Sequence, residues 1–316
     1  MTGYIVRRVI VAIIVTIGIA VIAFLMLHYL SPSPVYSVLG AKTTPEAAAA
    51  WNRTHGYDRS ELAQLISYLG NLVQLHFGYS YKLGQSVTAL FKENAGRSAY
   101  LTGAGLLLSL VIAIPLGILQ AVRRNSVLDY TFTTWNFVLY SMPSFFLGLI
   151  LIQLFALDLN IFPPVVSDNT TSVWQSFTHP VQLTLPIVTL AGINVALYSR
   201  YMRSSALDQL AQDYIRLARA KGLSERAVLF RHLLRNACLP MIILVGLSVP
   251  LLLAGNLLIE YLFNYPGLGL LFYQALGNQD YNILLAYTVV GGILTVIGNL
   301  MADVAITVAD PRVRVN

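Results

Sequence analysis

Charge is scarce in this sequence: only 11% of its 316 residues are Asp, Glu, Lys or Arg, against about 25% in an ordinary soluble domain. That deficit excludes an ordinary soluble protein. Hydrophobic residues make up 56% of the chain and are gathered into long uninterrupted runs. The composition is therefore typical of a protein whose solvent is a lipid bilayer.

Cysteine is nearly absent as well. Cys238 is the only one, which excludes a disulfide framework and a cysteine-rich metal or iron–sulfur site. We expect it to be a small packing residue at the edge of an apolar run. The five histidines never lie four residues apart, the spacing at which a His-Glu-x-x-His helix binds zinc. The sequence therefore predicts no metal site and gives no support to an intramembrane metalloprotease.

Other catalytic and binding patterns are missing too. A P-loop requires a Gly-Lys pair followed by Ser or Thr, and the sequence has no Gly-Lys pair, so the chain is not a P-loop ATPase by itself. No histidine lies in the middle of an apolar run, as an intramembrane Ser–His pair would require. The formal net charge of +6 does not indicate nucleic acid as a partner, because the cations form no aromatic-interleaved patch.

Six apolar runs are each long enough to cross a membrane as a helix, which takes about 20 residues. They are 9–30, 98–122, 130–157, 181–202, 237–262 and 283–309. The first is expected to be a retained anchor, because it is too long for a cleaved signal peptide and no small-x-small site follows it. The sequence thus predicts an all-α, polytopic membrane protein with six transmembrane helices.

The distribution of Lys and Arg predicts the orientation of these spans. Six spans place both termini on one side, and that side carries most of the 20 Lys and Arg residues. The other side carries only those within segment 31–97, which are Lys42, Arg53, Arg59, Lys82, Lys92 and Arg97. Both termini are therefore predicted to be cytoplasmic.

This arrangement divides the chain into four parts. They are a cytoplasmic tail with the first transmembrane helix (1–30), an external segment (31–97), a five-helix core (98–309) and a cytoplasmic C-terminal tail (310–316). The external segment contains a predicted helix near 61–75. The core contains one long cytoplasmic loop, 203–236, between spans four and five.

Loop 203–236 is predicted to fold into two short helices. Leu210, Tyr214, Leu217 (or Ala218) and Lys221 recur at helical spacing and predict an amphipathic first helix. The residue that follows, Gly222, is suited to a left-handed helix end.

A second helix is predicted directly after this glycine. Ser224 is a strong N-cap, and Glu225 suits the positive end of a helix dipole. Its apolar face would consist of Val228, Leu229, Leu233 and Leu234. Two interpretations remain open: the pair docks into a cytoplasmic protein partner, or it lies as a basic interfacial helix on anionic lipid.

Motifs in and after this loop point to one family. The stretch Asp213-Tyr-Ile-Arg-Leu-Ala-Arg-Ala-Lys-Gly-Leu-Ser-Glu225, followed by Arg231-His-Leu-Leu-Arg-Asn-Ala237, resembles the coupling loop of binding-protein-dependent ABC importers. Pro266-Gly-Leu-Gly269 and Asp310-Pro-Arg312 extend the resemblance, which is strongest to the dipeptide/oligopeptide/nickel permease branch. The chain departs from the general importer motif at Arg216 and Leu217, where that motif has Glu-Ala.

The resemblance implies a type I ABC importer permease fold in a bacterial or archaeal cytoplasmic membrane. The implied partners are a homologous second permease subunit, one or two ABC ATPase subunits, an external solute-binding protein and membrane lipid. ATP and Mg²⁺ would be used by the ATPase subunits, with no cofactor on this chain. The implied solute is a di- or oligopeptide, with a nickel- or haem-type solute as the alternative.

The resemblance also assigns site residues. Those expected to couple to the ATPase are Asp213, Arg216, Ala218, Arg219, Ala220, Lys221, Gly222, Ser224, Glu225, Arg226, Arg231, His232, Arg235 and Asn236.

Polar residues inside the apolar runs are the candidates for a translocation pathway. They are Asn136, Ser141, Gln153, Asn194 and Asn256. Such residues either form helix–helix hydrogen bonds or offer polar partners to the amide groups of a peptide stripped of water. A secondary transporter would place acids at mid-depth. Asp129, Glu260 and Asp303 instead fall nearer the ends of runs, where we predict ion pairs or caps.

Overall fold

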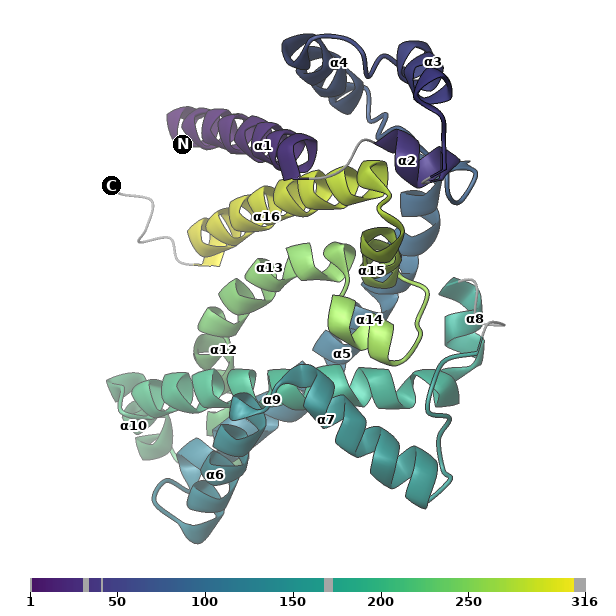
Figure 1. The fold of residues 1–316 in the computed structure, drawn as a ribbon. Helices are drawn as coiled ribbons and strands as arrows, with labels where there is room; N and C mark the ends of the chain where they lie inside the picture. Colours follow the sequence, from purple (N-terminus) through teal and green to yellow (C-terminus); the bar gives the residue numbers. More distant parts are fainter. Residues whose placement is uncertain (1, 31–33, 41, 168–172, 310–316) are drawn as a thin grey trace.

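The computed structural model describes residues 2–30, 34–40, 42–167 and 173–309 of the chain (Figure 1). The N-terminal part contains α1 (Thr2–Leu30), α2 (Pro34–Leu39), α3 (Pro45–His55), α4 (Glu61–Val73) and the strands β1 (Tyr79–Ser80) and β2 (Gln85–Ser86). The central part contains α5 (Val87–Val122), α6 (Val127–Ser141), α7 (Ser144–Leu151), the π-helical η1 (Ile152–Asp158), α8 (Val173–Thr178) and α9 (Pro180–Leu210).

The C-terminal part begins with four short helical segments, α10 (Asp213–Ala220), α11 (Glu225–Ala227), the π-helical η2 (Val228–Leu233) and α12 (Leu234–Ala237). They are followed by α13 (Leu239–Ala254), α14 (Leu257–Leu262), α15 (Leu268–Asn278) and α16 (Tyr281–Ala309). The predicted tail 310–316 lies outside the described residues. The chain is mostly helical, as predicted, with one correction: β1 and β2 form a small antiparallel hairpin.

Among the described residues, three continuous helices are long and apolar enough to cross a membrane: α5, α9 and the part Tyr281–Met301 of α16. Two further pairs of helices pass the same test together but are bent, which raises the number to five if each pair is one span. In α1, the described apolar part is the shorter stretch Ile10–Met26.

The third predicted span, 130–157, is not one helix. It is divided into α6 and a second helix made of α7 and η1 (Figure 1). The axis of this second helix is bent by 106° from that of α6. Pro143 causes the break, because a proline disfavours the helical conformation of the residue before it. Met142 is accordingly extended, with φ −87° and ψ 130°, and a new helix starts at Ser144.

The fifth predicted span, 237–262, is divided as well. Its main helix, α13, ends at Ala254, and Gly255 then adopts a left-handed φ of +79°. Asn256 begins α14 as an N-cap, since its Oδ1 accepts a hydrogen bond from the backbone N–H of Ile259 (3.3 Å). A second bend of 47° separates residues 225–237 from 239–248.

Two other spans extend beyond their predicted bounds. The second begins at Val87, so the last part of the predicted external segment belongs to α5. The fourth continues past residue 202 to Leu210.

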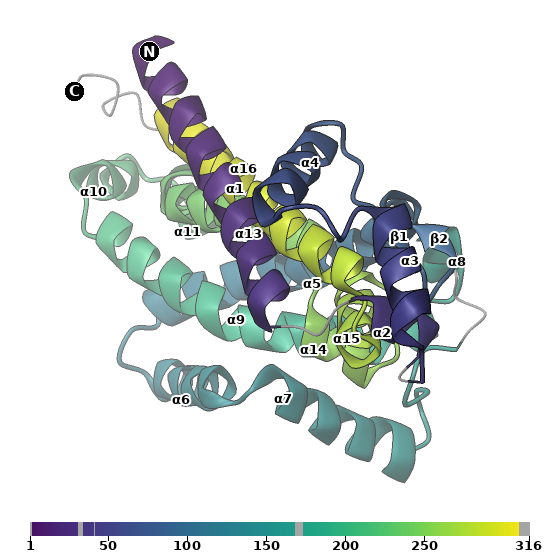
Figure 2. The ribbon, with the colours of Figure 1, turned by 45° about the horizontal axis from the view of Figure 1, so that its top comes forward.

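Helices α5 and α9 pack side by side at the centre of the molecule. The two helices approach each other closely at Gly117, where an added Cβ would lie 2.7 Å from the Ser199 carbonyl oxygen and 2.9 Å from the Arg203 nitrogen. Small residues allow this backbone approach between membrane helices. Helix α16 packs on α13, and α1 crosses α16 on the other side (Figure 2).

Candidate functional site

The two-helix segment, residues 213–237, lies at one end of α9 (Figure 1). Its first helix starts at Asp213 rather than earlier, because the chain turns at Ala211 and Gln212. Leu210 therefore belongs to α9, which corrects the predicted continuous amphipathic helix.

The inward face of α10 also differs in part from the prediction. Ile215 and Ala218 are buried, whereas Leu217 is 56% exposed. Of the two predicted alternatives at this position of the face, Ala218 is correct and Leu217 is wrong. These two apolar residues are adjacent in the sequence, so apolar periodicity alone could not decide between them.

Gly222 ends α10 as predicted, in a left-handed conformation with φ +76°. The N–H of Gly222 donates to the Arg219 carbonyl (2.9 Å), and the N–H of Leu223 donates to the Ala218 carbonyl (3.4 Å). This pair of bonds is a Schellman motif. Directly afterwards, the Ser224 hydroxyl accepts a hydrogen bond from the N–H of Ala227 (3.4 Å) and caps α11. The sequence therefore specifies both sides of this turn.

An ion pair joins the two helices across Gly222. The Arg219 Nε lies 2.8 Å from Glu225 Oε1, and the Arg219 Nη2 lies 3.3 Å from Glu225 Oε2. The side chains are 44% and 61% exposed, so the pair contributes at most about 1 kcal/mol to folding. Its geometry, with two parallel bonds, fixes the orientation of one helix relative to the other.

The inner face of the two-helix segment is part of the membrane-helix core. Ile215, Val228 and Leu233 are fully buried and belong to the same apolar cluster as Met202 of α9 and Ala121 of α5. Because protein interiors are close-packed, a displacement of this segment must be accommodated by α5 and α9. The predicted apolar face of the second helix is confirmed at Val228 and Leu233.

The outer face carries most of the predicted coupling residues. The exposed ones are Asp213, Arg216, Arg219, Ala220, Lys221, Gly222, Ser224, Glu225, Arg226, Arg231 and Arg235. Ala218 is buried, whereas His232 and Asn236 are half-buried. Cations outnumber acids on this face. It also exposes apolar side chains that were not predicted to lie there, notably Phe230 at 71% and Leu223 at 41%.

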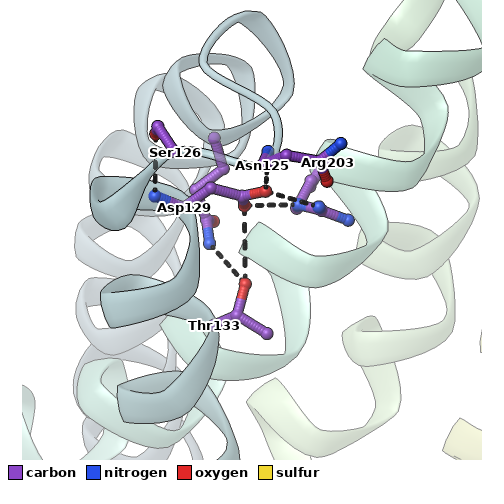
Figure 3. Close-up of polar contacts among 6 residues, drawn as sticks. Asn125, Ser126, Asp129, Thr133 and Arg203 are labelled. Carbon is purple, nitrogen blue, oxygen red and sulfur yellow. Dashed lines mark hydrogen bonds and ion pairs between the residues drawn. The ribbon is translucent and has the colours of Figure 1, made fainter.

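A buried ion pair connects α6 to α9 close to this segment. Figure 3 shows the Asp129 carboxylate facing the Arg203 guanidinium, at distances of 2.8 Å from Oδ1 to Nε and 2.7 Å from Oδ2 to Nη2. The carboxylate also accepts from the Asn125 N–H (3.0 Å) and lies 3.5 Å from the Thr133 hydroxyl. Asp129 is 2% exposed. The sequence predicted an ion pair or a cap for Asp129, but it did not identify Arg203 as the partner.

A second buried network lies toward the other end of α5, around Glu260. One carboxylate oxygen accepts from the N–H groups of Gly269 (2.7 Å) and Leu270 (3.1 Å) at the start of α15. The other accepts from Ser98 of α5 (2.7 Å) and from the N–H of Asn256 (3.2 Å). Glu260 therefore ties α5, α14 and α15 together and caps α15, where a negative charge is favoured.

The loop Tyr265–Gly269, next to Glu260, is also hydrogen-bonded to α5. Arg97 Nη1 donates to the Pro266 carbonyl (3.2 Å), and the Tyr265 hydroxyl donates to the Arg97 carbonyl (3.0 Å). Burial raises the pKa of Tyr265 to about 12, so its hydroxyl stays protonated and keeps donating at neutral pH.

The five candidate pathway residues each have a different local environment. Asn136 is buried and donates to the Ser199 hydroxyl (2.8 Å), a contact between α6 and α9. Ser141 bonds to its own helix, Gln153 to Asp158, and Asn256 is the N-cap described above. Asn194 is half-buried on α9. Within the described part of the chain, none of the five forms a hydrogen bond with another.

These features define a multi-span membrane protein with a packed, basic two-helix segment at one end of its long helices. Residues 113–315 match the family described as "Binding-protein-dependent transport system inner membrane component", and residues 1–93 match the family described as "Binding-prot-dependent transport system membrane comp, N-term". The chain belongs to this family of inner membrane components.

Three relatives illustrate the match. The chain is 36% identical to the oligopeptide transport system permease protein AppB of Bacillus subtilis (strain 168) over 314 residues, covering 99% of each chain. It is 30% identical to the dipeptide transport system permease protein DppB of Lactococcus lactis subsp. cremoris (strain MG1363) over 315 residues, 99% of this chain and 100% of the relative. It is 31% identical to the glutathione transport system permease protein GsiC of Salmonella choleraesuis (strain SC-B67) over 314 residues, 99% of each.

Membership of this family indicates which subunit carries out transport and which hydrolyses ATP. The chain is the permease component of an ABC importer and is not an enzyme, since ATP hydrolysis in such importers is carried out by separate ATPase subunits. The family also implies a substrate-binding partner. The apolar helices accordingly belong to a multi-pass protein of a bacterial membrane.

Proposed function

We propose that this chain forms half of the pathway by which a bacterial ABC importer takes up short peptides. Relatives whose names specify oligopeptide, dipeptide and glutathione transport support the substrate class. A homologous second permease subunit completes the pathway, and a solute-binding protein delivers ligand to segment 31–97. ATP and Mg²⁺ are used by one or two ATPase subunits that dock on the two-helix segment.

The proposal includes six spans with both termini in the cytoplasm. The excess of Lys and Arg on the side of the two-helix segment supports this orientation. The bent pair of α6 with α7–η1 then counts as the third span. Helix α13, which follows the 47° bend after residue 237, counts as the fifth, and α1 as the first. Asn136, Ser141, Gln153, Asn194 and Asn256 are retained as candidates for lining the pathway in the assembled dimer of permeases.

One observation carries the coupling mechanism: the two-helix segment has a packed inner face and an exposed outer face. Ile215 and Val228 join the core of α5 and α9, while Arg216 and Phe230 are exposed. A partner that binds the outer face can therefore displace the membrane helices without a flexible link between them. Arginine and aromatic side chains are also enriched at protein interfaces.

Substitution of Gly222 tests this mechanism. A β-branched residue in a left-handed turn costs roughly 1–2 kcal/mol, so Gly222→Val is expected to lower the equilibrium constant for forming the native turn by about tenfold. Gly222→Asn should be tolerated, since Asn adopts this conformation more readily. In the reconstituted complex, we expect Gly222→Val to insert normally but to lose most ligand-stimulated ATPase activity and peptide uptake.

The matched control is Gly84→Val. Gly84 also has a left-handed φ (+66°) with no neighbouring atom within 4 Å, but it lies in segment 31–97. Its substitution introduces comparable backbone strain and should leave intact the ATPase activity measured without the solute-binding protein. Equal uptake by Gly222→Val and the wild type would overturn the coupling role of this turn.

Exposed Phe230 and Leu223 would also suit contact with lipid, the other interpretation of this segment. A photo-crosslinker placed at position 230 separates the two interpretations. Adducts with the ATPase subunit are expected from the assembled complex. Adducts with lipid alone, in a complex that hydrolyses ATP, would establish an interfacial helix.

A further inference from the structure

A cavity of about 750 Å³ lies in the N-terminal part of the molecule, and the function proposed above does not use it. Helix α4 lies beside α1, with α3 on its other side (Figure 2), and α1, α3, α4 and α16 all contribute to the cavity wall. Its volume falls within the range of pockets that hold small ligands, roughly 300–1,000 Å³. The cavity is therefore large enough for a small ligand the size of a short peptide.

The wall contains polar atoms without partners. Asn52 Oδ1, Tyr68 Oη and Tyr281 Oη are buried and form no hydrogen bond within the described structure, and all three residues line the cavity. A buried polar atom that lacks a partner costs about 1–3 kcal/mol. Such atoms are rare in folded proteins, and an additional bonding group is the usual explanation.

The cavity is also electrostatically one-sided. Arg59, His28, His55 and His76 line it, and no carboxylate does among the described residues. Two acids close to the wall are already engaged. Glu61 accepts from the Tyr29 hydroxyl (2.6 Å) and lies 3.6 Å from His28. Asp280 accepts from the Ser80 hydroxyl (2.5 Å). The cavity therefore favours a ligand that carries an anionic group.

Aromatic rings form much of the remaining wall. The ring of Phe24 stacks on that of Tyr68, with centroids 5.6 Å apart, and Phe77 and Tyr57 also line the cavity. Burial, reinforced by Tyr81 and Asp280, raises the pKa of Tyr57 to about 12, so its hydroxyl is neutral. Apolar side chains and backbone amides can both be accommodated by such a wall.

We propose that this cavity binds a short peptide by its C-terminal end, before the peptide enters the translocation pathway. The carboxylate lies at Arg59 and the neighbouring histidines, and the peptide amides bond to Asn52, Tyr68 and Tyr281. This inference rests on the proposed function for its choice of peptides as substrate. It adds a peptide site on the permease itself, in segment 31–97 and at the start of α16.

The test compares two ligands that differ only at the C-terminus. The probes are a mixed tetrapeptide library and the same library with amidated C-termini, applied to the purified complete transporter without its solute-binding protein. We expect the acid library to bind at least about tenfold more tightly than the amidated one, because a hydrogen bond to a charged group contributes roughly 1.5–3 kcal/mol. Equal binding of the two libraries, or no binding of either, would overturn the proposal.

Variants locate the site. Arg59→Gln should remove most of the preference for the acid, whereas Arg53→Gln, an exposed arginine on α3 that does not line the cavity, should keep it. Tyr68→Phe removes only an unpartnered hydroxyl and should weaken binding severalfold without impairing folding. If Arg59→Gln and Tyr68→Phe both bind like the wild type, the cavity is not the peptide site.

Uptake separates this inference from the proposed function. Peptide import by the complete transporter together with unchanged binding by Arg59→Gln rejects the cavity site alone. Absence of peptide import by the wild-type transporter rejects the proposed function. A third outcome would overturn the peptide assignment. If the peptide-free solute-binding protein shields the cavity residues from solvent and no peptide binds directly, a protein loop occupies the cavity.

Discussion

Gly222 in the two-helix segment and Gly267 in the Pro266-Gly-Leu-Gly269 loop both belong to motifs, yet they are glycine for different reasons. Gly222 has a φ of +76°, and no atom lies within 4 Å of the position a Cβ would take. Gly267 has a φ of −113°, which any residue adopts, but a Cβ there would overlap the Glu260 carboxylate. Conformation requires the first glycine, and lack of space requires the second.

This difference extends to the surroundings of each loop. The Glu260 network is buried and binds three helices through charged hydrogen bonds, so it is a rigid joint. The turn at Gly222 is exposed and is crossed by an exposed ion pair, so its outer face is available to a partner. Substitutions in the Glu260 network should therefore act mainly on the stability of the fold. Substitutions at the Gly222 turn should act mainly on coupling to the ATPase.

The largest effect on stability is expected from Glu260→Ala. It leaves the N–H groups of Gly269, Leu270 and Asn256 without their acceptor, and the loss should reach about 3 kcal/mol or more. Thermal unfolding of the purified protein measures it, with the exposed Glu46→Ala as control. Matching melting temperatures for the two variants would show that the network is not a structural joint.

An intermediate effect is expected from Asp129→Ala, which leaves the Arg203 guanidinium without its carboxylate. The Arg203 side chain is 28% exposed, so water compensates in part and we expect a loss of about 2 kcal/mol. The exposed Asp208→Ala on α9 is the control. A double variant with Arg203→Ala should lose less than the sum of the two single variants, and strict additivity would contradict a direct interaction.

The smallest effect is expected from Arg219→Gln. Its ion pair with Glu225 is exposed at both ends, so the free energy of unfolding should change by less than about 1 kcal/mol. Arg216→Gln is the matched control, since Arg216 lies 3.5 Å from Asp213 and is more exposed. A loss as large as that of Glu260→Ala would remove the distinction between the two regions.

Local features of the sequence predicted much of the two-helix segment. Gly222 and Ser224 act through their own backbone conformation or through neighbours three or four residues away. The same kind of local rule existed at Met142-Pro143 and at Gly255-Asn256, where the spans break. At these two breaks the prediction followed the long apolar runs and assumed continuous helices. Helices in membranes tolerate proline and glycine when neighbours satisfy the freed backbone groups.

The choice of inward residues on α10 could not be made from the pattern. Leu217 and Ala218 are both apolar and adjacent, and only the packing against α9 and η2 selects the smaller one. The cavity beside α4 is similarly invisible in the sequence, since its wall is assembled from α1, α3, α4 and α16.

The sequence by itself determined a membrane protein, its apolar runs and the turn at Gly222, because these depend on composition and on short-range backbone preferences. Only the tertiary structure decided which polar groups meet. Glu260 bonds to Ser98 across 162 positions of the chain, and Asp129 pairs with Arg203 across 74. Partners so far apart are brought together by helix packing, and no local pattern encodes that distance.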